Sequence, residues 1–186
     1  MRRVAVALLH HPVLGRERQV LTTTLTNLDL HDIARCVRAY GLEAFFAVHP
    51  YQSQRTLAER IRRHWVSGAG GKRIPDRAVA LEKVRVVADL DTARAELTEG
   101  NGRAELWTTA ASAGGGALTS YAAARATLER AGDPVLICFG TGWGLTPEVL
   151  AAADLRLAPI SAARDTGYNH LSVRAACAIT LDRLFG

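Results

Sequence analysis

Short runs of hydrophobic residues alternate along the chain with longer amphipathic stretches. Most of the runs have the length and enrichment in Val, Leu and Ile that are typical of buried strands. They lie at residues 3–9, 42–48, 84–87, 104–108, 135–139 and 155–157. Strands alternating with helices predict an α/β fold, in which a mostly parallel sheet carries helices on both faces. Ligands of such sheets bind in the loops at the carboxyl ends of the strands.

The stretches between these runs repeat hydrophobic residues at helical spacing. One stripe precedes Gly41 and a second follows residue 55. Their members are Leu30, Ile33, Ala34 and Val37 in the first, and Leu57, Ile61 and Trp65 in the second. The last stretch, about His170–Leu184, is apolar on nearly every side and predicts a buried helix. The Gly-rich stretches Ser67–Lys72 and Gly114–Gly116 are interpreted as mobile surface loops within one domain.

Composition narrows the class of protein. A chain of 186 residues, of which 48% are hydrophobic, predicts one domain over residues 1–186 with its own core. No apolar run is long enough for a membrane span. The three dispersed cysteines predict reduced thiols in a cytoplasmic protein, and no cluster of ligands predicts a metal site. A net charge of +5 favours an anionic partner such as nucleic acid.

Two glycine-rich motifs resemble nucleotide-binding loops, but the match fails. The run Gly68–Lys72 lacks the first glycine and the Ser or Thr of a phosphate loop. Gly140, Gly142 and Gly144 follow a strand with GxGxG spacing, whereas a dinucleotide fold has GxGxxG. These glycines nevertheless allow a ligand to approach the backbone closely. His10 and His11 have no ligand partners at suitable spacing and are interpreted as loop residues.

Three C-terminal segments in order carry a family resemblance. They are residues 136–145 (LICFGTGWGL), residues 157–160 (LAPI) and residues 168–173 (YNHLSV) before the final helix. They resemble motifs of the SPOUT methyltransferases. With the run 26–35 (TNLDLHDIAR), the whole chain resembles a bacterial family of predicted SPOUT RNA methyltransferases.

The resemblance implies a fold and an activity. It implies an α/β fold with a deep C-terminal trefoil knot, at roughly residues 134–186, and a homodimer with the active site at its interface. It also implies transfer of a methyl group from S-adenosyl-L-methionine (SAM) to a nucleotide of structured RNA, tRNA or rRNA. The alternatives are a non-catalytic RNA- or nucleotide-binding protein of the same fold and a nucleotide-cofactor oxidoreductase. The intact glycines of residues 139–145 disfavour the first, and their spacing disfavours the second.

The same resemblance implies the residues that bind SAM. They come from three loops, and the candidates are Thr108, Thr109, Ala110, Phe139, Gly140, Gly142, Gly144, Leu145, Ile160, Tyr168, Asn169, His170 and Leu171. Asn169 could instead cap the last helix. Trp143 is either a lid or a packed aromatic residue.

The candidate catalytic residues are Arg35, Asp32, His31 and His170. Helical spacing places His31, Arg35 and Arg38 on a polar face opposite the apolar stripe. Arg35 lies six residues before Gly41, where the ribose-methylating branch of the family also has an arginine. That branch has Asn six residues before the arginine, whereas this chain has Asp29. Methylation of the base and methylation of the ribose therefore both stay open. In one interpretation, Arg35 orients or deprotonates the acceptor group. In the other, Asp32 or His31 is the base and Arg35 holds a phosphate, because a guanidinium group is always charged and is a poor base. An Asp32–Arg35 surface ion pair is the purely structural alternative.

Basic residues are concentrated around Trp65. Such side chains bind phosphates without reading sequence. The candidate RNA-binding residues are Arg38, Arg60, Arg62, Arg63, Lys72 and Arg73.

Overall fold

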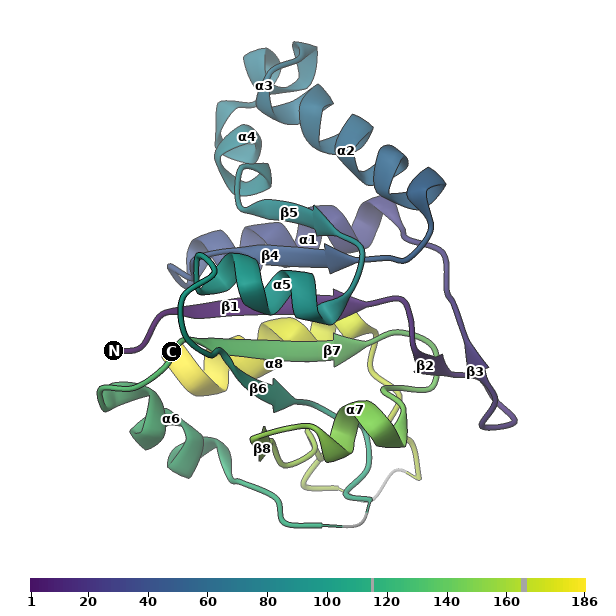
Figure 1. Ribbon diagram of the computed structural model, residues 1–186, viewed down its shortest axis with the longest axis vertical. Coiled ribbons are helices and arrows are strands. Elements are labelled where there is room, and N and C mark those ends of the chain that lie inside the picture. The colour runs from purple at the N-terminus through teal and green to yellow at the C-terminus, as the bar shows by residue number, and fades with distance from the viewer. Residues whose placement is uncertain (115, 165–166) are drawn as a thin grey trace.

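A computed structural model describes residues 1–114, 116–164 and 167–186 (Figure 1). Its elements, in chain order, are β1 (Val4–Leu9), β2 (Val13–Leu14), β3 (Val20–Leu21), α1 (Asn27–Ala39), β4 (Phe45–Val48), α2 (Gln52–Val66), α3 (Ala69–Arg73), α4 (Pro75–Leu81), β5 (Val84–Val87), α5 (Leu90–Leu97), β6 (Glu105–Thr108), α6 (Tyr121–Glu129), β7 (Val135–Gly140), α7 (Pro147–Ala151), β8 (Leu155–Arg156) and α8 (Val173–Phe185).

The main sheet has the order β5-β4-β1-β7-β6-β8, and every neighbouring pair in it is parallel. The prediction of a parallel sheet covered by helices is confirmed. The chain first builds outward from β1 through β4 to β5, and then returns to the other side of β1 with β6 and β7. The strand order therefore reverses between β1 and β7, and such a switch point is where open parallel sheets bind ligands.

Helices cover both faces because β1 is buried along its whole length and alternate residues face opposite sides. Val4, Val6 and Leu8 join the core beneath α1, α6 and α8, whereas Ala5, Ala7 and Leu9 join the core beneath α5 and α7. Figure 1 shows α5 in front of the sheet and α1 and α8 behind it.

Two expectations about helices were wrong. Residues 67–72 are not a surface loop, because most of them belong to α3. A Cβ on Gly71 would lie 2.1 Å from the Trp65 carbonyl oxygen, so the glycine allows α3 to pack against the end of α2. The second hydrophobic stripe is right for Ile61 and Trp65, which pack half-buried against the core, but wrong for Leu57, which is exposed; Ala58 is the buried residue of α2. Of the other Gly-rich stretch, Gly114 and Gly116 lie outside any helix or strand, and residue 115 lies outside the described residues.

The final helix begins at Val173 rather than at His170. It is not buried on all sides, because Cys177, Thr180, Leu181 and Leu184 are its buried residues and its other apolar residues are half-buried. All three cysteines are free thiols, as expected.

Candidate functional site

A cavity of about 1420 Å³ opens at the carboxyl ends of β1, β6 and β7. Four segments supply most of its described wall: residues after β1, residues 109–114 after β6, residues 139–145 after β7, and residues 156–164 and 167–173 between β8 and α8. It lies at the switch point of the sheet. Pockets for drug-sized ligands usually measure roughly 300–1,000 Å³, so this cavity has room for a nucleoside-sized ligand and a second group beside it.

Backbone hydrogen bonds to β2 fix the position of the Gly-rich turn after β7. The Trp143 amide donates a hydrogen bond to the Leu14 carbonyl (2.8 Å), and the Leu14 amide donates one to the Gly144 carbonyl (2.9 Å). Gly142 has a φ of +61°, and a Cβ there would lie 2.8 Å from the Leu14 oxygen. Glycine at position 142 is therefore required by the close approach of the β2–β3 hairpin, which the sequence did not predict.

A buried polar network continues from this turn. Thr23 Oγ1 lies 2.5 Å from Thr141 Oγ1 and 3.0 Å from His10 Nδ1, while His49 Nε2 lies 3.0 Å from the Thr23 carbonyl. His10 lies in the loop after β1, as expected, but it is fully buried, and burial together with the nearby His49 lowers its pKa to about 4. His10 is therefore neutral at physiological pH, and its network fixes two threonines on the cavity wall.

The segment before α8 forms the opposite wall. The Asn169 side-chain amide donates a hydrogen bond to the Ala111 carbonyl (2.6 Å), which ties this segment to the loop after β6. Ser172, not Asn169, caps α8, so the interpretation of Asn169 as the cap was wrong. Its neighbours Tyr168 and His170 form an edge-to-face chain with Trp143, with ring centroids 5.4 and 5.6 Å apart.

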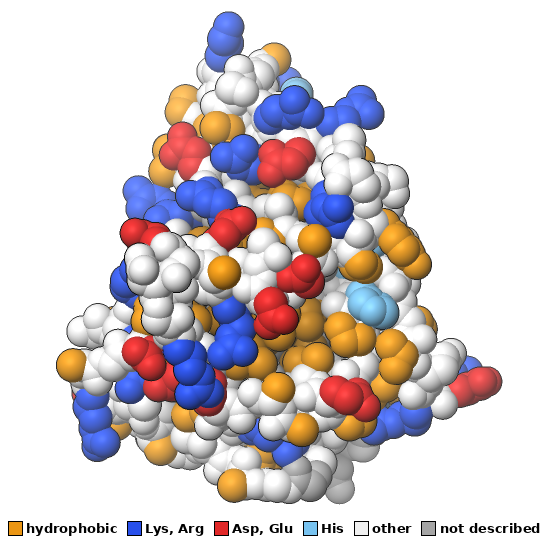
Figure 2. All heavy atoms as spheres, in the orientation of Figure 1, with side chains coloured by type: hydrophobic (Ala, Val, Ile, Leu, Met, Phe, Trp, Pro, Cys, Tyr) orange, Lys and Arg blue, Asp and Glu red, His pale blue; other side chains and the backbone are white. Residues whose placement is uncertain are grey.

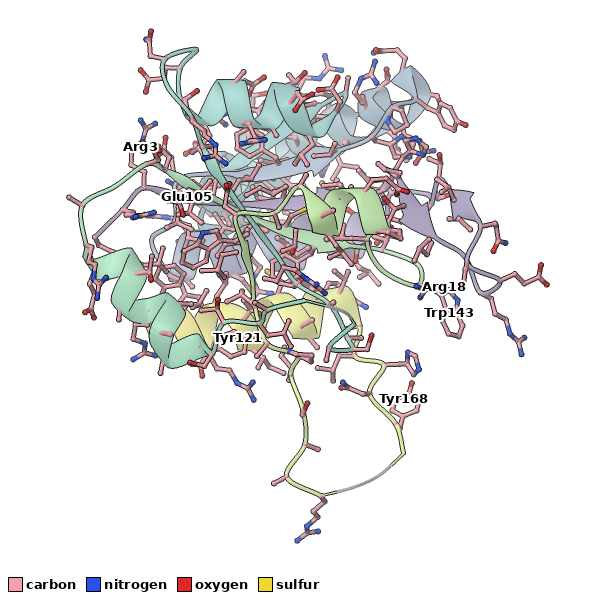
Figure 3. All side chains as sticks on the ribbon, turned by 60° about the horizontal axis from the view of Figure 1, so that its bottom comes forward. Arg3, Arg18, Glu105, Tyr121, Trp143 and Tyr168 are labelled. Atoms are coloured by element: carbon pink, nitrogen blue, oxygen red, sulfur yellow. The ribbon has the colours of Figure 1, made fainter. Side chains whose placement is uncertain are left out.

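Trp143 is a lining residue rather than a packed core aromatic, because 53% of it is exposed and it borders the cavity. Figure 3 shows it on the turn after β7, with Tyr168 on the segment before α8. The two loops thus present aromatic surface to a ligand.

The predicted SAM-binding residues converge on this cavity. All of them line it except Thr108, which is buried within β6. The hydroxyl of Thr109 donates to the Cys138 carbonyl (3.1 Å), which holds the loop after β6 against β7.

The predicted catalytic residues do not all meet there. Of the four, only His170 lines the cavity. His31 is buried at the start of α1, with its ring 5.2 Å from that of Trp65, so this part of the helix face is not polar and solvated as expected. Burial and the nearby Arg77 lower the pKa of His31. Arg35 and Arg38 are exposed as expected.

Asp32 has a different partner from the one expected. Arg174 of α8 donates a hydrogen bond to Asp32 Oδ2 (3.0 Å), and its Nε lies 3.4 Å from Asp29 Oδ1. Arg174 therefore bridges two carboxylates of α1. No ion pair between Asp32 and Arg35 occurs among the described residues.

Asp29 was missed as a functional candidate, together with Arg18, Thr23 and Thr141; all four line the cavity. The signal that could have found Arg18, Thr23 and Asp29 was their position after β1, because residues that follow a central parallel strand lie at its ligand-binding edge.

The candidate RNA-binding residues lie on α1, α2 and α3. Figure 2 shows Lys and Arg side chains gathered at the end of the molecule where α2, α3 and α4 lie. Arg60, Arg63, Lys72 and Arg73 are exposed, but Arg62 is half-buried and 3.5 Å from Glu59. Arg77, another basic residue close to Trp65 in the sequence, has its guanidinium carbon 4.9 Å from the centroid of the Trp65 ring.

Neither a metal cluster nor a membrane-spanning helix occurs in the described part of the chain. Within 1–114, 116–164 and 167–186, no group of three or more His, Cys, Asp or Glu side chains is arranged to hold a metal ion. None of the helices that these residues form has the length and hydrophobicity to cross a membrane.

The fold and cavity define a class, an open parallel α/β sheet with a large ligand site at its switch point. Within that class, a family model described as SAM-dependent RNA methyltransferase matches residues 3–186, and the chain belongs to this family. It is 43% identical over 185 residues to a protein of Nitratidesulfovibrio vulgaris named tRNA (guanine-N(1)-)-methyltransferase. The match covers 100% of this chain but only 42% of that relative.

Solved structures confirm the fold. TrmJ from Z. mobilis has a TM-score of 0.61 at 16% identity, with 99% of this chain and 68% of that one covered. The TrmH/SpoU tRNA-modifying enzyme of A. aeolicus has a TM-score of 0.54 at 15% identity, with 99% and 74% covered. The family model confirms the predicted resemblance to SAM-dependent RNA methyltransferases and SAM as the cofactor of that family, whereas these neighbours confirm the fold.

Proposed function

We propose that this chain transfers a methyl group from SAM to a nucleotide of structured RNA, tRNA or rRNA. The observation that carries the proposal is the convergence of three loops, those after β6 and β7 and the one before α8, on one cavity at the switch point. The relative's name favours tRNA, but more than half of that relative lies outside the match, so its named reaction is not assigned to this chain.

The cavity suits the chemical groups of SAM. Leu145, Ile160 and Leu171 offer apolar walls for an adenine ring, and the backbone of the turn after β7 offers hydrogen-bonding groups for its edge. A Cβ on Gly144 would meet no atom within 4 Å, so the turn leaves space beside its backbone. When bound, SAM supplies an activated methyl group on a sulfonium sulfur. The chain must then position the acceptor and remove its proton.

We also propose a homodimer in which Arg35 reaches the cavity of the partner subunit. Arg35 is exposed and does not line the cavity of its own chain, which supports donation across an interface. The half-buried apolar residues of α8, among them Ile179, support burial of this helix in a dimer. Arg35→Ala should preserve SAM affinity and abolish transfer, and sedimentation should give the mass of two chains. A monomeric, fully active protein would contradict this arrangement.

RNA is expected to bind across α2 and α3, through Arg60, Arg63, Lys72 and Arg73, with Arg38 beside them on α1. Their exposure and concentration support this assignment. Arg62 takes part less directly because Glu59 already neutralises it.

One domain over residues 1–186, knotted within about 134–186, completes the proposal. The hydrogen bond between Asn169 and Ala111 and the bridge between Thr119 and Leu157 support it, because they pack two parts of this C-terminal region against the segment that follows β6. A single cooperative unfolding transition is expected for one domain, and a crystal structure would trace whether the chain end passes through the loop.

The decisive experiment uses radiolabelled SAM with tRNA and rRNA as separate arms, prepared from cells that lack the gene for this chain. Calorimetry with SAM is done first. Binding followed by label in one RNA fraction, located by nucleoside mass spectrometry, is the expected result. Binding without transfer to either fraction would favour a non-catalytic RNA-binding protein, and no binding at millimolar SAM would exclude the proposed function.

A further inference from the structure

Asp29 is the one carboxylate among the described residues that line the cavity. The other titratable side chains of this wall are His170, two tyrosines and three arginines. The tyrosines and arginines hold their protons at neutral pH. Asp29 and His170 are therefore the two described side chains of the cavity wall whose residue types can accept a proton at neutral pH.

Asp29 is fixed by its surroundings. Only 8% of it is exposed, and it lies in the first turn of α1, where the helix dipole favours a negative charge. Thr26 Oγ1 donates a hydrogen bond to its Oδ2 (2.5 Å), and Arg174 Nε lies 3.4 Å from its Oδ1. An ionised carboxylate has about four lone-pair positions, so these two contacts leave acceptor positions free on a side chain that lines the cavity.

The other candidates on α1 are less suitable. Asp32 is held by Arg174 outside the cavity lining, and His31 is buried against Trp65. Arg35 is a permanent cation. His170 is exposed at the aromatic mouth of the cavity, whereas a proton acceptor benefits from a fixed position within hydrogen-bond reach of the acceptor group.

We propose that Asp29 is the catalytic residue that accepts the proton of the RNA acceptor group. This inference rests on the proposed methyltransferase function. An acceptor O–H or N–H forms a bond from oxygen or nitrogen to the methyl carbon, the S–CH₃ bond breaks, and its electron pair stays on sulfur to give S-adenosylhomocysteine. The acceptor proton moves to a carboxylate oxygen of Asp29 and is then released to water.

Asp29→Asn and Asp32→Asn form a matched pair for the test. Each replaces one carboxylate partner of Arg174 with an amide of the same shape, but only Asp29 lines the cavity. For wild type and both variants, SAM affinity is measured by calorimetry and single-turnover transfer from labelled SAM is measured on the RNA fraction that the wild type methylates.

Asp29→Asn should bind SAM normally and transfer methyl groups at least roughly 10²-fold more slowly, the lower end of what general bases contribute. Asp32→Asn should transfer near the wild-type rate. Equal losses in the two variants would reduce Asp29 to an ion-pair partner of Arg174 and overturn the assignment. Loss of SAM affinity in Asp29→Asn would place the carboxylate in the cofactor site or the fold and would also overturn it. No transfer by the wild type would remove the proposed function itself, which separates the two failures.

Discussion

The contact between the β2–β3 hairpin and the turn after β7 predicts the effect of a single methyl group. Gly142→Ala places a Cβ 2.8 Å from the Leu14 carbonyl oxygen, at a φ of +61°. The left-handed conformation costs about 1–2 kcal/mol for a residue with a Cβ. Relief of the overlap moves the turn from the hairpin and weakens two backbone hydrogen bonds, each contributing about 0.5–1.5 kcal/mol.

These contributions add to about 3 kcal/mol, which corresponds to a loss of up to roughly 10²-fold in SAM affinity, at 1.4 kcal/mol for each factor of ten. Gly41→Ala is the matched control. Its φ is +70°, its Cβ would meet no atom within 4 Å, and it lies outside the cavity lining. It should lose about 1 kcal/mol of stability and no SAM affinity.

Titration calorimetry with SAM, and thermal unfolding for both variants, provide the measurement. Unchanged SAM affinity in Gly142→Ala would refute the reasoning, because the hairpin would then not set the shape of the turn.

Three further outcomes follow from charge, burial and exposure. The free energy of unfolding should fall by up to about 3 kcal/mol as pH drops from about 6.5 to about 4, because buried His10 stays neutral in the folded protein and binds a proton in the unfolded chain. Denaturant titrations across this pH range should show the fall, and His10→Asn should make it smaller. Replacing Arg60 and Arg63 with Ala should weaken RNA binding and reduce the steepness of log K against log salt by about 0.7–0.9 for each phosphate that these side chains neutralise. Replacing exposed Arg130, at the end of α6, should leave both the affinity and this slope unchanged. SAM should change the tryptophan fluorescence through exposed Trp143, and Trp143→Phe should abolish that change while keeping the fold.

The strands were predictable within three residues because each strand of the main sheet is marked by an apolar run, such as Val4–Leu9. The helix α3 was not, because glycine usually signals a loop, and only the packing of Gly71 against Trp65 explains it. The two-residue strands β2 and β3 are too short to leave a periodic signal.

The candidate site was predictable where it consists of consecutive motif residues, as at Gly140–Leu145. It was not predictable where it depends on contacts between distant segments. The role proposed for Asp29 depends on its contact with Arg174, which is distant in the sequence. The burial of His10 likewise depends on a network with Thr23 and Thr141 that only the fold brings together. Helical spacing alone placed His31 on a polar face, because it carried no information about α2 packing over that turn.

The central position of β1 also has a consequence for synthesis of the protein. β1 lies between β4 and β7, and β7 is made about 130 residues after β1. Until the ribosome has released β7, the apolar strand Val4–Leu9 has one unpaired edge, which is a template for aggregation. Contacts this distant in sequence slow folding. A nascent chain of this protein is therefore expected to need a chaperone over β1 until β7 has left the ribosome.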